Sequence, residues 1–241
     1  MKKHFFLFII LFKVLIILPW FGYSQFVVNN SAIALGNNTF QLTPYVLWVG
    51  GSVWYEYKTD LSKPFTLSGW MNFGNDTIGA DGNVFVLQNS CLNAGMMGGG
   101  IGYRNMPGQS LGVEFDTYKN TTPITGDQDN HDPTFDHIGI FKNGSVVHDT
   151  VGLPNPNDLL KAYIQASPTK RNIKDGLPHN FKITWDPIKK KLQVFFEDTI
   201  VKPRASIICD IPNAVFSGNP FVYWGFTSAT GGERNIHTVH V

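Results

Sequence analysis

Two carboxylic acids separated by one residue lie in the part of the sequence that is richest in groups able to do chemistry. Glu114 and Asp116 alternate with apolar residues, so on a β-strand they would project from the same face as Tyr118 and, further along, Asn120. At about 3.4 Å per residue the two acids would be about 7 Å apart, and burying both without a cation would be costly. The segment that follows supplies further polar ligands: Asp127, Asp129, His131, Asp132, Asp136 and His137.

These residue types favour a metal site, although two other interpretations stay open. Carboxylate, amide and carbonyl oxygens are the ligands that Ca²⁺ prefers, and an imidazole widens the choice to a transition metal such as Mn²⁺. The alternatives are a solvated acidic loop after a half-buried strand, and a glycosidase, in which two carboxyl groups about 5–9 Å apart cleave a glycosidic bond. A hydrolase must keep one carboxyl group neutral, whereas a divalent ion keeps both ionised. Asn120 can ligate a metal but cannot transfer a proton as a carboxyl group does.

The elements that must hold these residues are strands. The clearest is a hairpin over residues 181–197, where apolar and polar residues alternate on both sides of a turn at 186–190. Only residues 158–166 have a helical pattern. Further strands are expected at residues 65–73, 83–88, 110–118, 137–142, 221–228 and 235–241. Many strands, turns rich in Gly, Asn and Pro, and little helix predict one all-β domain, a sandwich or a barrel.

Composition and the first residues place the protein in a broad class. Only 15% of the 241 residues are charged, against roughly 25% in average proteins, and the net charge is +1. These values argue against disorder and against a basic surface for nucleic acid. Residues 1–24 combine a basic start, an apolar stretch that Lys13 interrupts, and small residues at Gly22 and Ser24, which is the layout of a cleaved signal peptide. We therefore expect a secreted domain over residues 25–241 that does not stay in a membrane; whether Cys91 and Cys209 pair is left open.

Five short motifs occur in an order that resembles the legume-type (L-type) lectins, and most closely the bacterial branch of that family. The motifs cover residues 80–82, 99–102, 113–120, 132–140 and 225–232. The resemblance extends from about residue 26 to the end of the sequence. It implies a concanavalin A-like jelly-roll β-sandwich, with a flat back sheet, a curved front sheet and a shallow site formed by loops at one end.

The resemblance implies two metal ions a few ångströms apart. Ca²⁺ would be bound by Asp116, the backbone carbonyl of Tyr118, Asn120 and Asp132. A second ion such as Mn²⁺ would be bound by Glu114, Asp116, Asp132 and His137. The segment between Asn120 and Asp132 is longer than in the plant lectins, so Asp127 or Asp129 is an alternative to Asp132, and some family members lack the second ion.

The resemblance also implies a sugar site, made by Asp81, Gly99, Tyr118, Asn120, Gly231 and Gly232. Asp81, after a cis peptide bond from Ala80, would accept hydrogen bonds from sugar hydroxyl groups. The Gly99 N–H and the Asn120 amide would donate to the sugar, and the Tyr118 ring would cover its apolar face. The backbone amides of Gly231 and Gly232 would complete the site.

We therefore expect a secreted, metal-dependent lectin without enzymatic activity. Its partners would be glycans or glycoconjugates. Plant relatives often oligomerise through the back sheet, and whether this protein forms such a homodimer is left open. One alternative is a glycoside hydrolase of the same fold, but such enzymes usually have Glu-x-Asp-x-x-Glu, and Lys119 stands at the last position here. The other is an adhesive module that has lost its sugar site, against which Asp81 and Asn120 argue. We expect four other histidines to be surface or loop residues: His131, His148, His179 and His237.

Overall fold

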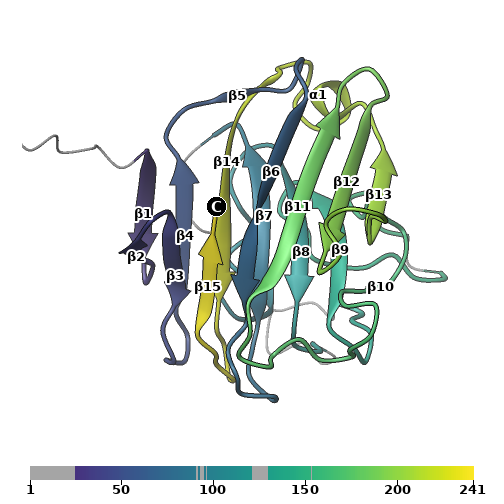
Figure 1. The fold of residues 1–241 in the computed structure, drawn as a ribbon. Helices are drawn as coiled ribbons and strands as arrows, with labels where there is room; N and C mark the ends of the chain where they lie inside the picture. The colour runs from purple at the N-terminus through teal and green to yellow at the C-terminus, as the bar shows by residue number, and fades with distance from the viewer. Residues whose placement is uncertain (1–24, 91, 93–94, 96, 121–129, 153) are drawn as a thin grey trace, which may run out of the picture.

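The computed structural model describes residues 25–241, apart from 91, 93, 94, 96, 121–129 and 153. They form two antiparallel sheets stacked face to face (Figure 1). The eight-stranded sheet contains β1 (Phe26–Asn30), β4 (Gly50–Tyr55), β14 (Phe221–Ala229), β7 (Gly82–Gln88), β8 (Ser110–Asp116), β9 (His137–Lys142) and β10 (Ile164–Gln165) in that order, with β5 (Thr59–Asp60) paired to β14. The seven-stranded sheet contains β13 (Ala205–Ile208), β12 (Lys191–Phe196), β11 (His179–Asp186), β6 (Phe65–Asn72), β15 (His237–His240), β3 (Thr39–Thr43) and β2 (Ile33–Gly36).

Two short helices accompany the sheets, a 3₁₀ turn at Gly98–Gly100 and α1 at Ile211–Ala214. Over the described ranges, none of the helices has the length and apolar character needed to cross a membrane. The predicted signal peptide at residues 1–24 lies outside the described residues, and so does Cys91. Cys209 is a half-buried free thiol.

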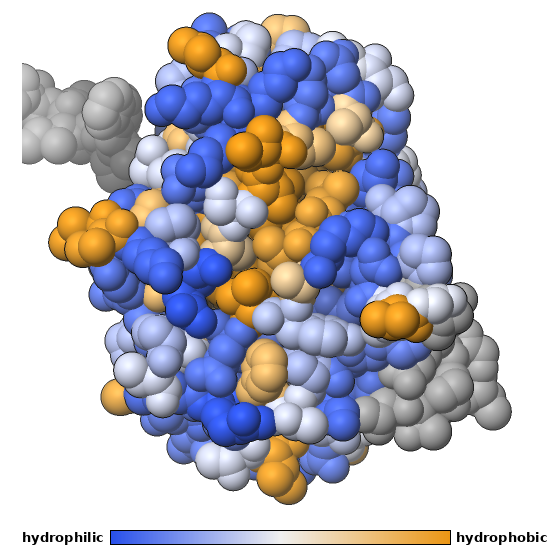
Figure 2. Space-filling view, turned by 90° about the vertical axis from the view of Figure 1, so that its right-hand side faces the viewer, coloured by the Kyte–Doolittle hydropathy of each residue, from blue (hydrophilic) through white to orange (hydrophobic). Residues whose placement is uncertain are grey.

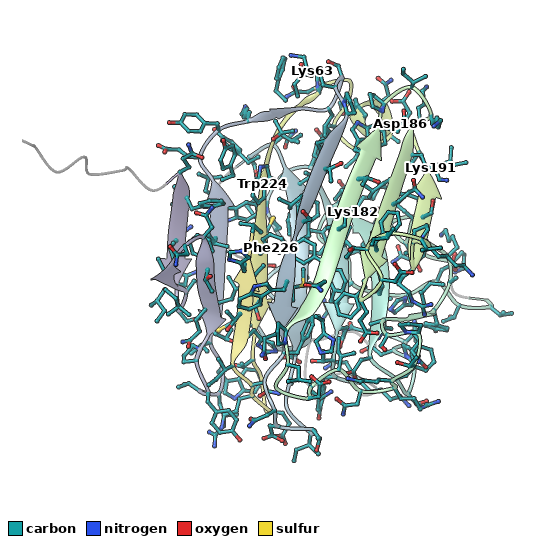
Figure 3. The ribbon with its side chains drawn as sticks, in the orientation of Figure 1. Lys63, Lys182, Asp186, Lys191, Trp224 and Phe226 are labelled. Atoms are coloured by element: carbon teal, nitrogen blue, oxygen red, sulfur yellow. The ribbon has the colours of Figure 1, made fainter. Side chains whose placement is uncertain are left out.

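The hairpin of β11 and β12 shows how alternation builds the seven-stranded sheet. Phe181 pairs with Phe196 and Ile183 pairs with Val194, and all four side chains are buried between the sheets. Lys182 lies halfway along β11, while Asp186 and Lys191 lie at the turn end of the hairpin (Figure 3). The predicted hairpin is therefore confirmed, with its apolar rows facing the other sheet.

Strand β8 is buried on both of its faces, which decides where its two acids lie. Val113 and Phe115 belong to the main core between the sheets. A second core, which includes Trp54, Val84 and Tyr103, covers the other face of the eight-stranded sheet. Because side chains alternate along a strand, Glu114 and Asp116 point away from the main core and towards the segments that cover the outer face.

The all-β sandwich is confirmed, and two local predictions are wrong. Residues 158–166 are not a helix: the Asp158 carboxylate accepts hydrogen bonds from the N–H groups of Leu160 and Lys161, at 3.0 Å each, and this fixes a turn before β10. The strand predicted to run to Tyr118 ends at Asp116, because the Asp116 carboxylate accepts the Tyr118 N–H at 2.7 Å and bends the chain. Helix α1 was not expected from the sequence.

The inter-sheet core is incompletely covered where β13 and β10 end the two sheets. Figure 2 shows this side of the molecule, with apolar surface running between the sheets. Ile208 in β13 is 79% exposed, and Leu159, Leu160 and Cys209 are only partly buried against the core.

His148, His179 and His237 are buried, so none of them is a surface residue. His148 lies in a loop, as the prediction allowed, whereas His179 and His237 lie in β11 and β15, so for those two the prediction is wrong. His237 lies between the sheets, and its Nδ1 is 2.7 Å from the Thr43 hydroxyl oxygen. That hydroxyl donates its proton to the Asn235 carbonyl, so it must accept from Nδ1–H. Nε2 has no hydrogen-bond partner among the described residues. The buried ring is therefore neutral, and burial, aided by the positive charge of Lys174, lowers the pKa of His237 to about 3.

This burial predicts a specific loss of stability in acid. The unfolded chain binds a proton at His237 near its ordinary pKa of about 6.5, whereas the native state does so only near 3. Stability is therefore complete above pH 6.5 and falls as the pH is lowered towards the native pKa. Between pH 6.5 and 4.5 we expect His237 to account for about 2 kcal/mol of lost stability, at 1.36 kcal/mol per unit. The free energy of unfolding, measured with urea at pH 6.5 and 4.5, should fall by about 2 kcal/mol less in His237→Gln than in the wild type. His240→Gln is the control and should behave as the wild type does. An equal fall in all three proteins would contradict the assignment.

Candidate functional site

Strands β8 and β9 position the central ligands. Asp116 pairs with His137, and Glu114 pairs with Gly139. Glu114, Asp116 and His137 are each 1% exposed. A Cβ atom at Gly139 would lie 2.8 Å from the Glu114 carboxylate, so the glycine leaves the space that the carboxylate occupies. The site is thus built into the sheet.

A compact group of carboxylates and imidazoles surrounds His137. Its Nε2 lies 4.0 Å from Glu114 Oε2 and 3.9 Å from Asp132 Oδ1. It also lies 2.8 Å from Nε2 of His148. The donor atoms of Asp116, Asp132 and His137 lie within 4.8 Å of one another, and so do those of Glu114, His137 and His148.

This group concentrates negative charge in a buried place. Burial, and then the Asp132 carboxylate, raise the pKa values of Asp81, Glu114 and Asp116 well above their ordinary range. Arg104 opposes this shift for Glu114. Burial lowers the pKa of His137 well below its ordinary value and that of His148 to about 4, so both imidazoles are neutral and able to ligate a metal.

The donor set fits the expected metals. Both oxygens of Glu114, Oδ2 of Asp116 and Oδ1 of Asn120 have no hydrogen-bond partner within the described part of the chain, although such buried groups normally have one. Asn120 N–H donates to Asp132 Oδ2 at 2.8 Å, so the structure places Asp132 beside Asn120. Hard oxygen donors suit Ca²⁺, and a carboxylate–imidazole set suits a transition metal.

The structure does not bring every acid of the following loop into this group. Asp136 accepts hydrogen bonds from the Ile173 N–H, at 2.7 Å, and from Lys174 Nζ, at 3.2 Å. It therefore holds the neighbouring segment. Asp127 and Asp129, the alternatives to Asp132, lie outside the described residues.

The residues of the predicted sugar site come from four separate segments, around residues 81, 99, 118–120 and 231–232. The Ala80–Asp81 peptide bond is cis, and the Asp81 carbonyl accepts from the Thr117 N–H at 2.8 Å. A Cβ atom at Gly231 would lie 3.4 Å from Asp81 Oδ2 and 2.9 Å from the Gly98 Cα. The ends of β7 and β14 and the 3₁₀ turn therefore meet around the Asp81 carboxylate.

Gly99 and Asn120 continue this series of contacts. A Cβ atom at Gly99 would lie 2.6 Å from Nδ2 of Asn120, so the Asn120 amide lies directly against the glycine backbone. The Asn130 side chain accepts a hydrogen bond from the Arg104 guanidinium and donates one to the Gly99 carbonyl at 3.0 Å. The 3₁₀ turn is therefore linked through Gly231 to Asp81 on one side. On the other side it is linked through Asn120 to the carboxylates and imidazoles around His137, which are called the metal-ligand group below.

The outer rim has two exposed aromatic rings. Tyr118 is 37% exposed and borders a hollow of about 400 Å³, whose wall includes Pro133 and Glu233. Trp48 is 53% exposed, and a Cβ atom at Gly98 would lie 3.5 Å from its ring. Gly232 is exposed, and a Cβ atom there would meet nothing within 4 Å among the described residues.

Sequence reasoning missed Trp48 and His148. Trp48 lies in an irregular segment between β3 and β4 with no local pattern to mark it. His148 lies in the segment between β9 and β10 that folds over the outer face. The sequence offered one indication: the separation between His137 and His148 is long enough for strand β9 and a loop that folds back over it.

Comparison with known proteins gives one family and a consistent fold. A family model described as legume lectin beta-barrel domain matches residues 23–241. The lectin from Bauhinia forficata in complex with GalNAc is 20% identical, with a TM-score of 0.62 and 92% of each chain covered. Lectin I-B4 from Griffonia simplicifolia, in its metal-free form, is 19% identical, with a TM-score of 0.68 and 92% of each chain covered.

The exoplasmic/lumenal domain of VIP36, in a Ca²⁺/Man3GlcNAc-bound form, is 19% identical, with a TM-score of 0.64. The match covers 90% of this chain and 81% of that one. At these identities the solved structures establish the jelly-roll fold.

Proposed function

Because this chain belongs to the legume-type (L-type) lectin family, we propose that it binds glycans through a site organised by Ca²⁺ and a second metal ion. One observation carries the proposal. Contacts run from Asp81 through Gly231 and the 3₁₀ turn to Asn120, and Asn120 is hydrogen-bonded to Asp132 in the buried ligand group. Similar structures in complexes with GalNAc and Man3GlcNAc support this function.

The chain's own residues divide the work of recognition. Asp116, Asn120, Asp132 and the Tyr118 carbonyl would hold Ca²⁺, while Glu114 and His137 would complete the second site with Asp116 and Asp132. Bound divalent ions would supply the positive charge that lets these buried carboxylates ionise together. The positioned Asn120 amide and the Gly99 N–H then donate to sugar hydroxyl groups.

Asp81 is the acceptor in this arrangement. Its Oδ2 is buried without a hydrogen-bond partner among the described residues, so sugar hydroxyl groups would satisfy it with charge-assisted bonds. Tyr118 and Trp48 offer apolar ring faces to the C–H groups of the sugar. The hollow beside Tyr118 has room for a neighbouring residue of a longer glycan.

Binding, not hydrolysis, fits the position of the acids. The similar proteins from Bauhinia forficata and Griffonia simplicifolia are named lectins, and Glu114 and Asp116 lie in the buried ligand group. A glycosidase acid must be free to transfer a proton to the leaving oxygen, which a carboxylate that ligates a metal ion cannot do. Incubation with glycans should therefore release no reducing sugar, and sustained release would favour the hydrolase.

The test of the proposed function is a glycan array probed with residues 25–241. We expect a defined set of glycans to be bound in Ca²⁺, lost in EDTA and recovered when Ca²⁺ is restored. A preparation that is folded and metal-loaded but binds no glycan would favour the adhesive module that has lost its sugar site. The bound set would also name the sugar class.

Gly99 provides a sharper test of the contact with Asn120. The side chain in Gly99→Ala would overlap the Asn120 amide, 2.6 Å away, and overpacking of this kind costs about 1–3 kcal/mol. We expect the affinity for the best array glycan to fall at least tenfold, measured by calorimetry. Gly232→Ala keeps the backbone N–H and meets nothing within 4 Å in the described structure, so its loss should be below threefold. Equal losses in the two variants would contradict the assigned contact.

Export is part of the same proposal. Residues 1–24 would direct secretion and then be removed. N-terminal sequencing of protein collected from the medium should begin at Gln25, and an intact Met1 start would contradict cleavage.

A further inference from the structure

His148 is a buried imidazole that the ligand set described above does not use. It is 1% exposed and lies in the segment that crosses the outer face between β9 and β10. The rings of Phe141 and Tyr163 pack around it, with centroids 5.1 and 5.0 Å away. Its orientation is therefore fixed by packing.

The fixed ring directs Nε2 into the metal-ligand group. This atom lies 2.8 Å from Nε2 of His137 and 4.0 Å from Asp132 Oδ1. Only one of two neutral imidazoles can donate in such a contact, and both nitrogens face the same point. Both oxygens of Glu114, which is 1% exposed, have no hydrogen-bond partner within the described residues and lie beside that point.

These separations match a single coordinated ion. The donor atoms of Glu114, His137 and His148 lie within 4.8 Å of one another. Donors held at about 2.1 Å by one tetrahedral zinc ion are about 3.4 Å apart. Side-chain shifts of about 1 Å would therefore bring all three into one coordination sphere.

A second partner orients His148 from behind. Its Nδ1 faces Asp158 Oδ2 at 3.8 Å, and both side chains are 1% exposed. Imidazoles that bind metals usually direct their other N–H at a carboxylate or carbonyl in this way. Asp158 therefore favours the form of His148 in which Nε2 carries the free lone pair.

We propose that His148 is a direct ligand of the second metal ion, together with Glu114 and His137, and that this two-imidazole set makes Zn²⁺ the resident ion. The inference rests on the proposed function, since it specifies the second metal of the same site. Imidazole donors suit zinc, whereas an all-oxygen set suits manganese. Asp116 and Asp132 remain available to bridge to Ca²⁺.

X-ray absorption at the zinc edge tests the ligand count directly. The probe is one equivalent of Zn²⁺ bound to residues 25–241 saturated with Ca²⁺. We expect the scattering signature of two imidazoles in the wild type and of one in His148→Ala. A single imidazole in the wild type would overturn the proposal, and that result does not depend on whether any variant folds.

Metal affinity provides the second measurement. Most sites of nitrogen and oxygen donors bind Zn²⁺ more tightly than Mn²⁺, so a preference for Zn²⁺ is not by itself evidence for His148. The informative quantity is the change in Zn²⁺ affinity when His148 is replaced. We expect His148→Ala to bind Zn²⁺ at least tenfold more weakly than the wild type, with Ca²⁺ affinity changed less than threefold. His240→Gln, which removes a histidine far from the group, should leave Zn²⁺ binding unchanged. An unchanged Zn²⁺ affinity in a folded His148→Ala would overturn the proposal.

Glycan binding in Ca²⁺ alone separates this inference from the function on which it rests. Ca²⁺-dependent glycan binding with a single imidazole on zinc would refute the role of His148 and leave the lectin function standing. Two imidazoles on zinc without any glycan binding would support the metal site and refute the lectin function.

Discussion

Removal of divalent metal is expected to lower the melting temperature by about 10 °C. Asp81, Glu114, Asp116 and Asp132 lie together in a buried place, and burial together with the Asp132 carboxylate raises the pKa values of Asp81, Glu114 and Asp116. An ion present at about 1,000 times its Kd stabilises the native state by roughly 4 kcal/mol. For a domain of this size each kcal/mol corresponds to about 2–4 °C.

The measurement is thermal unfolding of residues 25–241 after chelation and after Ca²⁺ is restored. We expect the loss to be reversed by Ca²⁺ but not by the same concentration of a monovalent salt, because ionic strength alone does not fill the site. A melting temperature that is unchanged by EDTA would show that no ion holds these carboxylates together.

Replacement of Asp81 by Asn should reduce glycan affinity at least 100-fold while the fold remains intact. Hydrogen bonds to a charged acceptor contribute about 1.5–3 kcal/mol each, and two of them account for a factor of 100 or more at 1.4 kcal/mol per tenfold. The backbone contacts of Asp81 with Ala229 and Thr117 do not involve its carboxylate. The variant also removes one acid from a crowded group, so its stability should not fall.

Calorimetric titration with the best array glycan measures this effect, and Ca²⁺ titration of the same variant tests its metal site. The matched control is Asp186→Asn, which removes an acid at the turn of the β11–β12 hairpin (Figure 3). If Asp81→Asn binds the glycan with the affinity of the wild type, Asp81 is not part of the sugar site. If Asp186→Asn loses as much glycan affinity as Asp81→Asn, the loss reflects the net charge of the protein.

Much of the fold could be predicted because alternation along a strand follows from burial of one of its faces. Residues 137–142 of β9 were predicted with the observed bounds, and the β11–β12 hairpin was predicted with its buried rows. The same rule already placed His237 on the face of Val239, which is buried. The expectation that His237 is a surface or loop residue was therefore inconsistent with the strand pattern itself.

The assembly of the site could not be derived from local pattern. Asp81, the 3₁₀ turn and Gly231 are separated by long stretches of sequence, and each alone is typical of a turn. Only the order of motifs shared with the L-type lectins brought them together. Strand β8 was predicted too long, because the Asp116 carboxylate bends the chain by a side-chain hydrogen bond that no periodicity reports.

His148 shows the limit of sequence reasoning in this protein. Its segment lies over the outer face of the eight-stranded sheet, where neither the period of a strand nor that of a helix applies. Burial there depends on Phe141 and Tyr163, which pack against the ring only after the segment has folded back. Its place beside the ligands is shown by the distance of 2.8 Å from its Nε2 to that of His137.

The most direct test of a metal-organised glycan site is one calorimetric series on a single preparation of residues 25–241. The best array glycan is titrated first in EDTA and then at increasing fixed concentrations of Ca²⁺. We predict no measurable heat in EDTA, and one glycan per chain once Ca²⁺ saturates its site, with affinity rising in step with Ca²⁺ occupancy. Glycan binding of equal affinity in EDTA and in Ca²⁺ would contradict the account.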